Sequence, residues 1–120
     1  MSSVLLIKSD EPGAERLRQA ILREEKYCVL VPNHAHAIRL MNSMTFDLVI
    51  IDIDSQEIIP EHISEFFRCK NFRIPIIAYS NESTKTDAQE LLNAGIDAFL
   101  PSPKDENEIC DVIGRWLKAG

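Results

Sequence analysis

Short apolar runs alternate along this chain with longer segments of helical periodicity. The apolar runs are rich in β-branched residues and end at polar residues, which is typical of strands. The run DLVIID, at residues 47–52, is apolar on both parities, as expected of a central strand that is covered on both faces. We predict five strands, at residues 4–7, 28–31, 48–52, 74–79 and 98–100.

Helical spacing between these runs predicts five helices. The last is marked most clearly, because apolar residues recur three and four positions apart along it and Asp105 can cap its first turn. In the fourth, Leu91 and Leu92 are expected to face the core, and Gly95 to end the helix in a left-handed conformation. The helices are expected over residues 12–25, from about residue 35 to 41, around residues 63–67, over residues 84–94 and after residue 105.

Strands and helices that alternate in this order predict an α/β fold with a parallel sheet and helices on both faces. We expect one domain over residues 1–120, built as a three-layer, flavodoxin-like doubly wound sandwich of five strands and five helices. The functional site of such a sheet lies beyond the carboxyl ends of its strands. Lys8, Asp52, Ser80 and Ser102 lie at or just after the ends of strands, so they are expected to share one rim.

Composition and charge narrow the range of partners. The net charge of −6 and the pI near 5.0 oppose binding to a nucleic acid or to an anionic membrane surface. No apolar run is long enough to span a bilayer, and the N-terminus lacks a secretory signal, so we expect a cytoplasmic protein. Cys28, Cys69 and Cys110 form no C-x-x-C motif and are expected to be reduced thiols in the core.

Three segments resemble the receiver domain of two-component response regulators, and the resemblance covers nearly the whole chain. FDLVIIDID, at residues 46–54, resembles the third strand of that family, and IPIIAYS, at residues 74–80, the fourth. AGIDAFLPSP, at residues 94–103, resembles the segment around the fifth strand. The resemblance implies the strand order 2-1-3-4-5 and a role in phosphorelay signal transduction.

The same resemblance assigns roles to four residues. Asp52 matches the aspartate that accepts a phosphoryl group, Ser80 the switch hydroxyl, Phe99 the switch aromatic and Pro103 the proline after the fifth strand. Phosphoryl transfer to a carboxylate needs fixed positive charge, which Mg²⁺ and a lysine supply in the family. A phosphorylated Asp52 would draw Ser80 inward and let Phe99 repack. The plainer alternatives are a turn hydroxyl at Ser80 and, at Phe99, a core residue or a half-buried surface aromatic.

The chain departs from the family pattern at the residues that would hold the metal. The acidic pair after the first strand is replaced by Lys8 and Ser9, and Asp10 is the next acid. The family lysine before the proline is replaced by Ser102, and Lys104 lies beyond that proline. We therefore expect no bound cofactor, with Mg²⁺ binding only if a rearranged acidic site works.

The remaining acids leave few metal ligands. Asp10 and Asp52 are the candidates, although Asp10 is first of all a candidate helix cap. Asp54 lies two residues after Asp52 and is either a partial replacement for the lost acids or a solvated loop carboxylate. The H-x-H motif at residues 34–36, even with His62, lacks a fourth ligand and is not expected to bind zinc.

We predict an ion pair between Lys8 and Asp52. The first and third strands are neighbours in the expected order, roughly 5 Å apart, so the ammonium of Lys8 can reach Asp52 and replace the missing metal as a counter-ion. The alternative is that Lys8 extends into solvent beside a solvated Asp52.

Two functional hypotheses follow. The first is a degenerate receiver, or pseudo-receiver, that acts by protein–protein interaction without Mg²⁺-dependent phosphorylation. The second is a working receiver that accepts a phosphoryl group at Asp52 from a histidine kinase. In neither is the chain an enzyme beyond autocatalytic phosphoryl transfer at Asp52. The expected partner is a signalling protein or a histidine kinase, with a homodimer through the last two helices and the fifth strand as a further option. The sequence leaves the pathway open, and also whether the domain stands alone or belongs to a longer chain.

Overall fold

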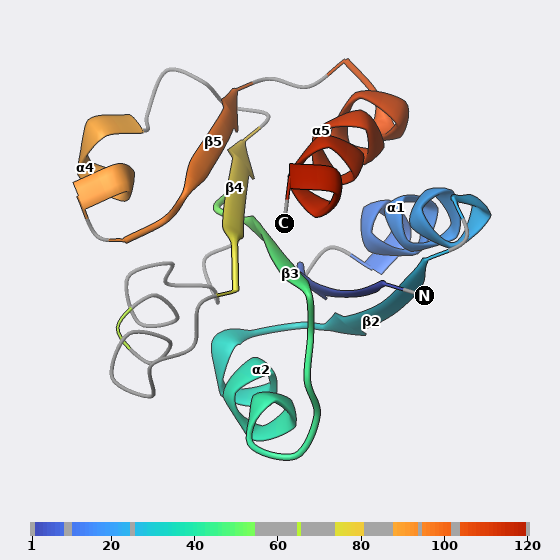
Figure 1. Cartoon of the computed structure of the whole chain (residues 1–120). Coiled ribbons are helices and arrows are strands. Elements are labelled where there is room, and N and C mark those ends of the chain that lie inside the picture. The colour runs from blue at the N-terminus through green and yellow to red at the C-terminus, as the bar shows by residue number, and fades with distance from the viewer. Residues whose placement is uncertain are drawn as a thin grey trace.

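Five parallel strands form one sheet, and their order, β2-β1-β3-β4-β5, is the predicted one (Figure 1). The computed structural model describes residues 2–8, 11–24, 26–54, 65, 74–80, 88–93, 95–101 and 104–119 of the chain. Each strand begins and ends within two residues of its predicted position. The strands are β1 (Ser3–Ile7), β2 (Tyr27–Val31), β3 (Leu48–Asp52), β4 (Ile76–Ser80) and β5 (Ala98–Pro101).

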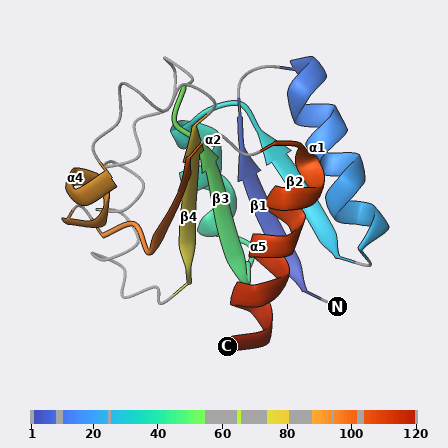
Figure 2. The same cartoon turned by 90° about the horizontal axis from the view of Figure 1, so that it is seen from above.

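Helices cover both faces of the sheet and complete the predicted three-layer sandwich. Figure 1 shows α1 and α5 on one side of the sheet and α2 and α4 on the other, and Figure 2 shows α1 and α5 in front of it. The third predicted helix, around residues 63–67, lies outside the described residues apart from Glu65, and so does the predicted start of the fourth at residue 84. The described helices are α1 (Glu11–Arg23), α2 (His34–Met41), α4 (Ala88–Asn93) and α5 (Glu106–Ala119).

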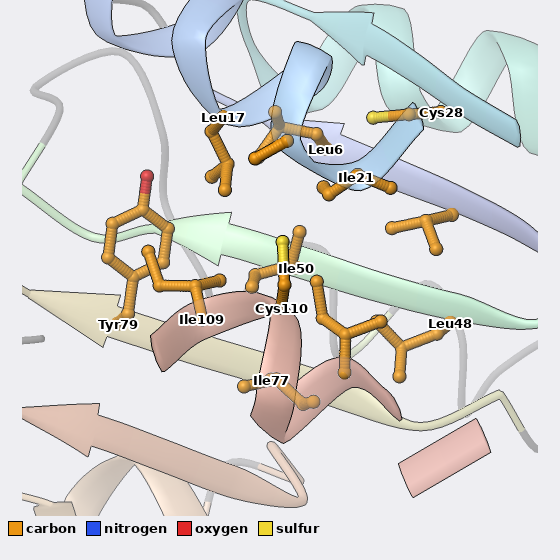
Figure 3. Close-up of a cluster of buried hydrophobic side chains, with 13 residues drawn as sticks. Leu6, Leu17, Ile21, Cys28, Leu48, Ile50, Ile77, Tyr79, Ile109 and Cys110 are labelled. Carbon is orange, nitrogen blue, oxygen red and sulfur yellow. The ribbon is translucent and has the colours of Figure 1, made fainter. Parts of the chain in front are cut away.

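Each face of the sheet carries its own hydrophobic cluster, because side chains alternate along a strand. Val4 and Leu6 of β1 belong to the cluster under α1 and α5, whereas Leu5 and Ile7 belong to the cluster under α2. The described part of β3 is fully buried on both faces, as its apolar pattern predicts. Figure 3 shows the first cluster, in which α1, α5 and the strands contribute the labelled residues Leu6, Leu17, Ile21, Cys28, Leu48, Ile50, Ile77, Tyr79, Ile109 and Cys110.

Cys28 and Cys110 are free thiols inside this cluster, as predicted, while Cys69 lies outside the described residues. Burial raises the pKa of the Cys28 thiol to about 12 and that of Cys110 to about 11. Both thiols are therefore protonated at neutral pH and behave as small apolar side chains.

The ends of three helices show how the sequence sets their limits. Asp105 Oδ1 accepts a hydrogen bond from the backbone N–H of Glu108 at 3.1 Å, which confirms the predicted cap of α5. Gly95 follows α4 with φ of 104°, the left-handed conformation predicted for it. The cap of α2, which was not predicted, is Asn33: its side chain accepts a hydrogen bond from the backbone N–H of His36 at 3.1 Å.

One prediction about α4 is wrong. Leu92 was expected to face the core, but it is 43% exposed. The side chain of Leu91, the other residue in this prediction, lies outside what the structure describes. Within the described parts of the chain, none of the helices combines the length and the apolarity that a bilayer crossing requires.

Candidate functional site

The candidate site forms where β1 and β3 end side by side. The parallel register pairs Ile7 with Ile51, so the next residues along, Lys8 and Asp52, lie opposite one another. The backbone N–H of Lys8 donates to the carbonyl of Val31 at 3.0 Å, which continues the β1–β2 ladder to this residue. Side chains two residues apart on a strand lie on the same face of the sheet. Lys8 therefore lies on the face of Leu6, and Asp52 lies on the face of Ile50. Both of these faces belong to the cluster under α1 and α5, so both side chains point toward these helices.

Lys8 and Asp52 form the predicted ion pair. Lys8 Nζ donates to Asp52 Oδ2 at 2.6 Å, and the two side chains are only 7% and 6% exposed. The alternative of a Lys8 side chain in solvent is therefore wrong. The attraction within a charge-assisted hydrogen bond of this length is stronger between buried groups than on the surface, but burying both charges also costs desolvation free energy.

The ammonium of Lys8 also contacts the aromatic ring of Tyr79, which was not among the predicted site residues. Lys8 Nζ lies 5.5 Å from the centre of the Tyr79 ring, and Tyr79 is paired with Asp52 in the β3–β4 register. The ring is buried, so this cation–π contact contributes more than it would at an exposed site. The signal for it was present in the sequence, because an aromatic residue precedes Ser80 on the strand beside Asp52.

A chain of hydrogen bonds runs from Lys8 to the predicted switch hydroxyl. The second oxygen of Asp52, Oδ1, accepts from the backbone N–H of Asp54 at 2.9 Å. Asp54 Oδ1 in turn accepts from Ser80 Oγ at 2.5 Å. Both carboxylate oxygens of Asp52 thus accept a hydrogen bond from a group of the same chain. Asp54 is exposed, as the loop-acid alternative predicted, yet its carboxylate also binds Ser80.

The structure places one more predicted residue near this network. Phe99 is half-buried and packs against the hydrophobic cluster under α2. Its register partner on β4 is Ala78, two residues before Ser80 on the same face of the sheet. The other predicted site residues, Ser9, Asp10, Ser102 and Pro103, lie outside the described residues.

The described residues of the site do not fit Mg²⁺, the metal that the fold family implies. Mg²⁺ requires several oxygen ligands in near-octahedral geometry. Here Lys8 brings a positive charge to Oδ2, one of the two oxygens that Asp52 could offer a metal, and Asp54 is the one further carboxylate that the described network includes. Across the described parts of the chain, no three His, Cys, Asp or Glu side chains are grouped as metal ligands.

The chain is similar to proteins of one signalling family. It is 24% identical over 114 residues to the probable transcriptional regulator ycf29 of Guillardia theta, a match that covers 95% of this chain and 51% of that protein. The chain therefore spans about half the length of this relative.

Solved receiver domains share its fold. The receiver domain of the Francisella response regulator 1452 superposes with a TM-score of 0.87 at 19% identity, covering 99% of this chain and 98% of that one. The receiver domain of the sensor histidine kinase PA1611 from Pseudomonas aeruginosa PAO1 has a TM-score of 0.79 at 22% identity, covering 98% of each chain, and holds a magnesium ion in its active site cleft. A family model for the response regulator receiver domain matches residues 4–114, and the chain belongs to that family.

Proposed function

We propose that the chain is a degenerate receiver that signals by protein–protein interaction without Mg²⁺-dependent phosphorylation. The observation that supports it best is the buried ion pair between Lys8 and Asp52. An aspartate that attacks a phosphoryl group must bring its negative charge toward several negative oxygens, which a bound divalent ion makes tolerable. Here the carboxylate of Asp52 is already held by a cation and by the backbone N–H of Asp54.

The ion pair opposes phosphorylation in two ways. A metal would have to displace the Lys8 ammonium from Asp52 Oδ2, which leaves that ammonium buried without its counter-ion. The same ammonium would then stand beside the divalent ion and repel it. The PA1611 receiver, which shares this fold, binds magnesium in its cleft. The sequence resemblance implies that Lys8 and Ser9 stand at the positions of the acidic pair that follows the first strand in the receiver family.

A second candidate function is a working receiver that accepts a phosphoryl group at Asp52 from a histidine kinase. It is favoured by the position of Asp52 at the carboxyl end of β3, with the hydroxyl of Ser80 on the next strand. In this alternative Lys8 leaves Asp52 when the donor binds, and Asp10 or Asp54 contributes to a rearranged metal site.

The proposal includes the kind of partner. A cytoplasmic signalling protein or a histidine kinase would bind the surface formed by α4, β5 and α5, through which a homodimer could also form. The net charge of −6 argues against nucleic acid as the partner of this domain.

Phosphoryl transfer from a small donor tests the proposal. The wild-type chain is incubated with acetyl phosphate and Mg²⁺, and its intact mass is measured before and after hydroxylamine treatment. We expect no hydroxylamine-labile mass gain, because the Lys8 ammonium occupies the carboxylate that must react. Rapid modification that disappears in the Asp52→Asn variant would show a working receiver and overturn the proposal. The Lys8→Asp/Ser9→Asp variant, which restores the acidic pair, is expected to gain modification and shows that the assay detects it.

A further inference from the structure

We propose that the carboxylate of Asp54 holds Ser80 as a phosphoryl group on Asp52 would, so that the switch formed by Ser80 and Phe99 is set without phosphorylation. This inference rests on the proposed function, since it describes what fixes the state of a receiver that is not phosphorylated. The ammonium of Lys8 then replaces the metal, and the carboxylate of Asp54 replaces the phosphate.

The hydrogen bond from Ser80 supports this role. Ser80 Oγ donates to Asp54 Oδ1 at 2.5 Å, the short distance typical of a hydroxyl bound to an ionised carboxylate. A serine hydroxyl carries a single hydrogen, so the one given to Asp54 is not available to an oxygen on Asp52. Ser80 itself is fully buried at the end of β4, so the donor side of this part-buried bond is shielded from water.

The position of Asp54 suits a phosphate substitute. Its backbone N–H donates to Asp52 Oδ1 at 2.9 Å, so its carboxylate is tethered directly beside the predicted acceptor. A carboxylate offers what a phosphoryl group offers to a hydroxyl, namely negatively charged acceptor oxygens. Because it belongs to the chain, it is present at all times and at a fixed position.

The state of Ser80 can reach Phe99 through the sheet. Ala78 pairs with Phe99 and Ser80 pairs with Pro101, so Ser80 and Phe99 are diagonal neighbours on the same face of adjacent strands. Ile53, between the two acids, packs with Phe99 against the hydrophobic cluster under α2. A change in how Ser80 is held therefore alters the space that the ring of Phe99 occupies.

Nuclear magnetic resonance of the Phe99 ring tests the inference on the full chain, without Mg²⁺ or phosphoryl donor. Ring resonances of phenylalanine-labelled protein are assigned with a Phe99→Leu variant. We expect Asp54→Ala and Ser80→Ala to move the Phe99 resonance in the same direction, and the double variant to move it no further than either. Asp54→Asn, which keeps an acceptor oxygen but lacks the negative charge, should move the Phe99 resonance in the same direction and by less than Asp54→Ala. The control is Asp111→Ala, at an exposed carboxylate on α5, which should leave the Phe99 resonance unchanged.

Two results would overturn the inference: a Phe99 resonance that Asp54→Ala does not move, or effects of Asp54→Ala and Ser80→Ala that simply add. Asp54 is exposed in a turn, so Asp54→Ala is expected to fold, and Asp54→Asn provides a second variant of nearly equal size. The outcome is separable from that of the proposed function. Phosphorylation of the wild-type chain would disprove the proposed function whatever Phe99 does, whereas an unmoved Phe99 would disprove this inference alone.

Discussion

At the end of β1, the ammonium of Lys8 has exchanged most of its hydration for the carboxylate of Asp52 and the ring of Tyr79. Removing two charges from water costs several kcal/mol for each, and their attraction repays this only when the contact is close and the remaining oxygens are bonded. Both conditions hold, because the contact is 2.6 Å and Asp52 Oδ1 binds the backbone of Asp54. Removing one partner alone should therefore be much more harmful than removing both.

The Lys8→Met variant should lose about 3 kcal/mol of unfolding free energy, because it leaves the Asp52 carboxylate buried without its counter-ion. The Lys8→Met/Asp52→Leu variant should recover most of this loss, since no unpaired charge remains. Urea denaturation measures both values. The matched control is Lys104→Met, at an exposed lysine, which should change stability by less than about 0.5 kcal/mol. Equal losses in Lys8→Met and the double variant would contradict this account of the pair.

At the scale of the elements, most of the fold could be predicted from the sequence. The strands followed from apolar runs, and β3 is buried on both faces as its pattern indicates. The predicted start of β4 at residue 74 is two residues early, because Pro75 lacks the N–H that a ladder needs, although its carbonyl accepts from Val49 at 2.9 Å.

The site was predictable only in part. The Lys8–Asp52 contact followed from the expected strand order and the close spacing of neighbouring strands. The bond between Ser80 and Asp54 did not, because it depends on the path of the turn after β3 and on side-chain rotamers, which no sequence period specifies.

The cap of α2 provides a test at this scale. Asn33 Oδ1 accepts a hydrogen bond from the backbone N–H of His36 at 3.1 Å, and the same oxygen lies 3.0 Å from Nδ1 of the His36 ring. Asn33→Ala should lower the unfolding free energy by about 1 kcal/mol, because the first turn loses its side-chain acceptor. Asn33→Asp, which keeps an acceptor oxygen, should lose less. Thermal unfolding followed by circular dichroism measures the difference, and an Asn33→Ala melting temperature equal to wild type would contradict the capping role.

At the scale of the whole molecule, the core makes stability depend on pH through its thiols. The pKa of Cys28 rises from its ordinary value near 9 to about 12, and that of Cys110 to about 11, because burial disfavours the thiolate. A group whose pKa is raised on folding stabilises the fold fully below its unfolded pKa. Its contribution is lost as pH rises from about 9 through the folded pKa. Each thiol should therefore lower the unfolding free energy by up to about 1.4 kcal/mol per pH unit in that range.

Alkylation measures the same burial directly. In a Cys69→Ser background at pH 8, iodoacetamide should modify Cys28 and Cys110 far more slowly in the native protein than in urea, because the native thiols are protonated and covered. Mass spectrometry of peptides resolves the two sites. Native rates that equal the rates in urea would show that the core opens readily and would contradict the packing described for this cluster.

The contact between Asp54 and Ser80 has a consequence for timing. The lifetime of a signal carried by an acyl phosphate is limited by the rate at which that acyl phosphate is hydrolysed. A state held by two side chains of the same polypeptide has no such limit on its lifetime. If this contact fixes the output, the cell can change the strength of the signal only by making or degrading the protein, or by supplying a competitor for the surface that it presents.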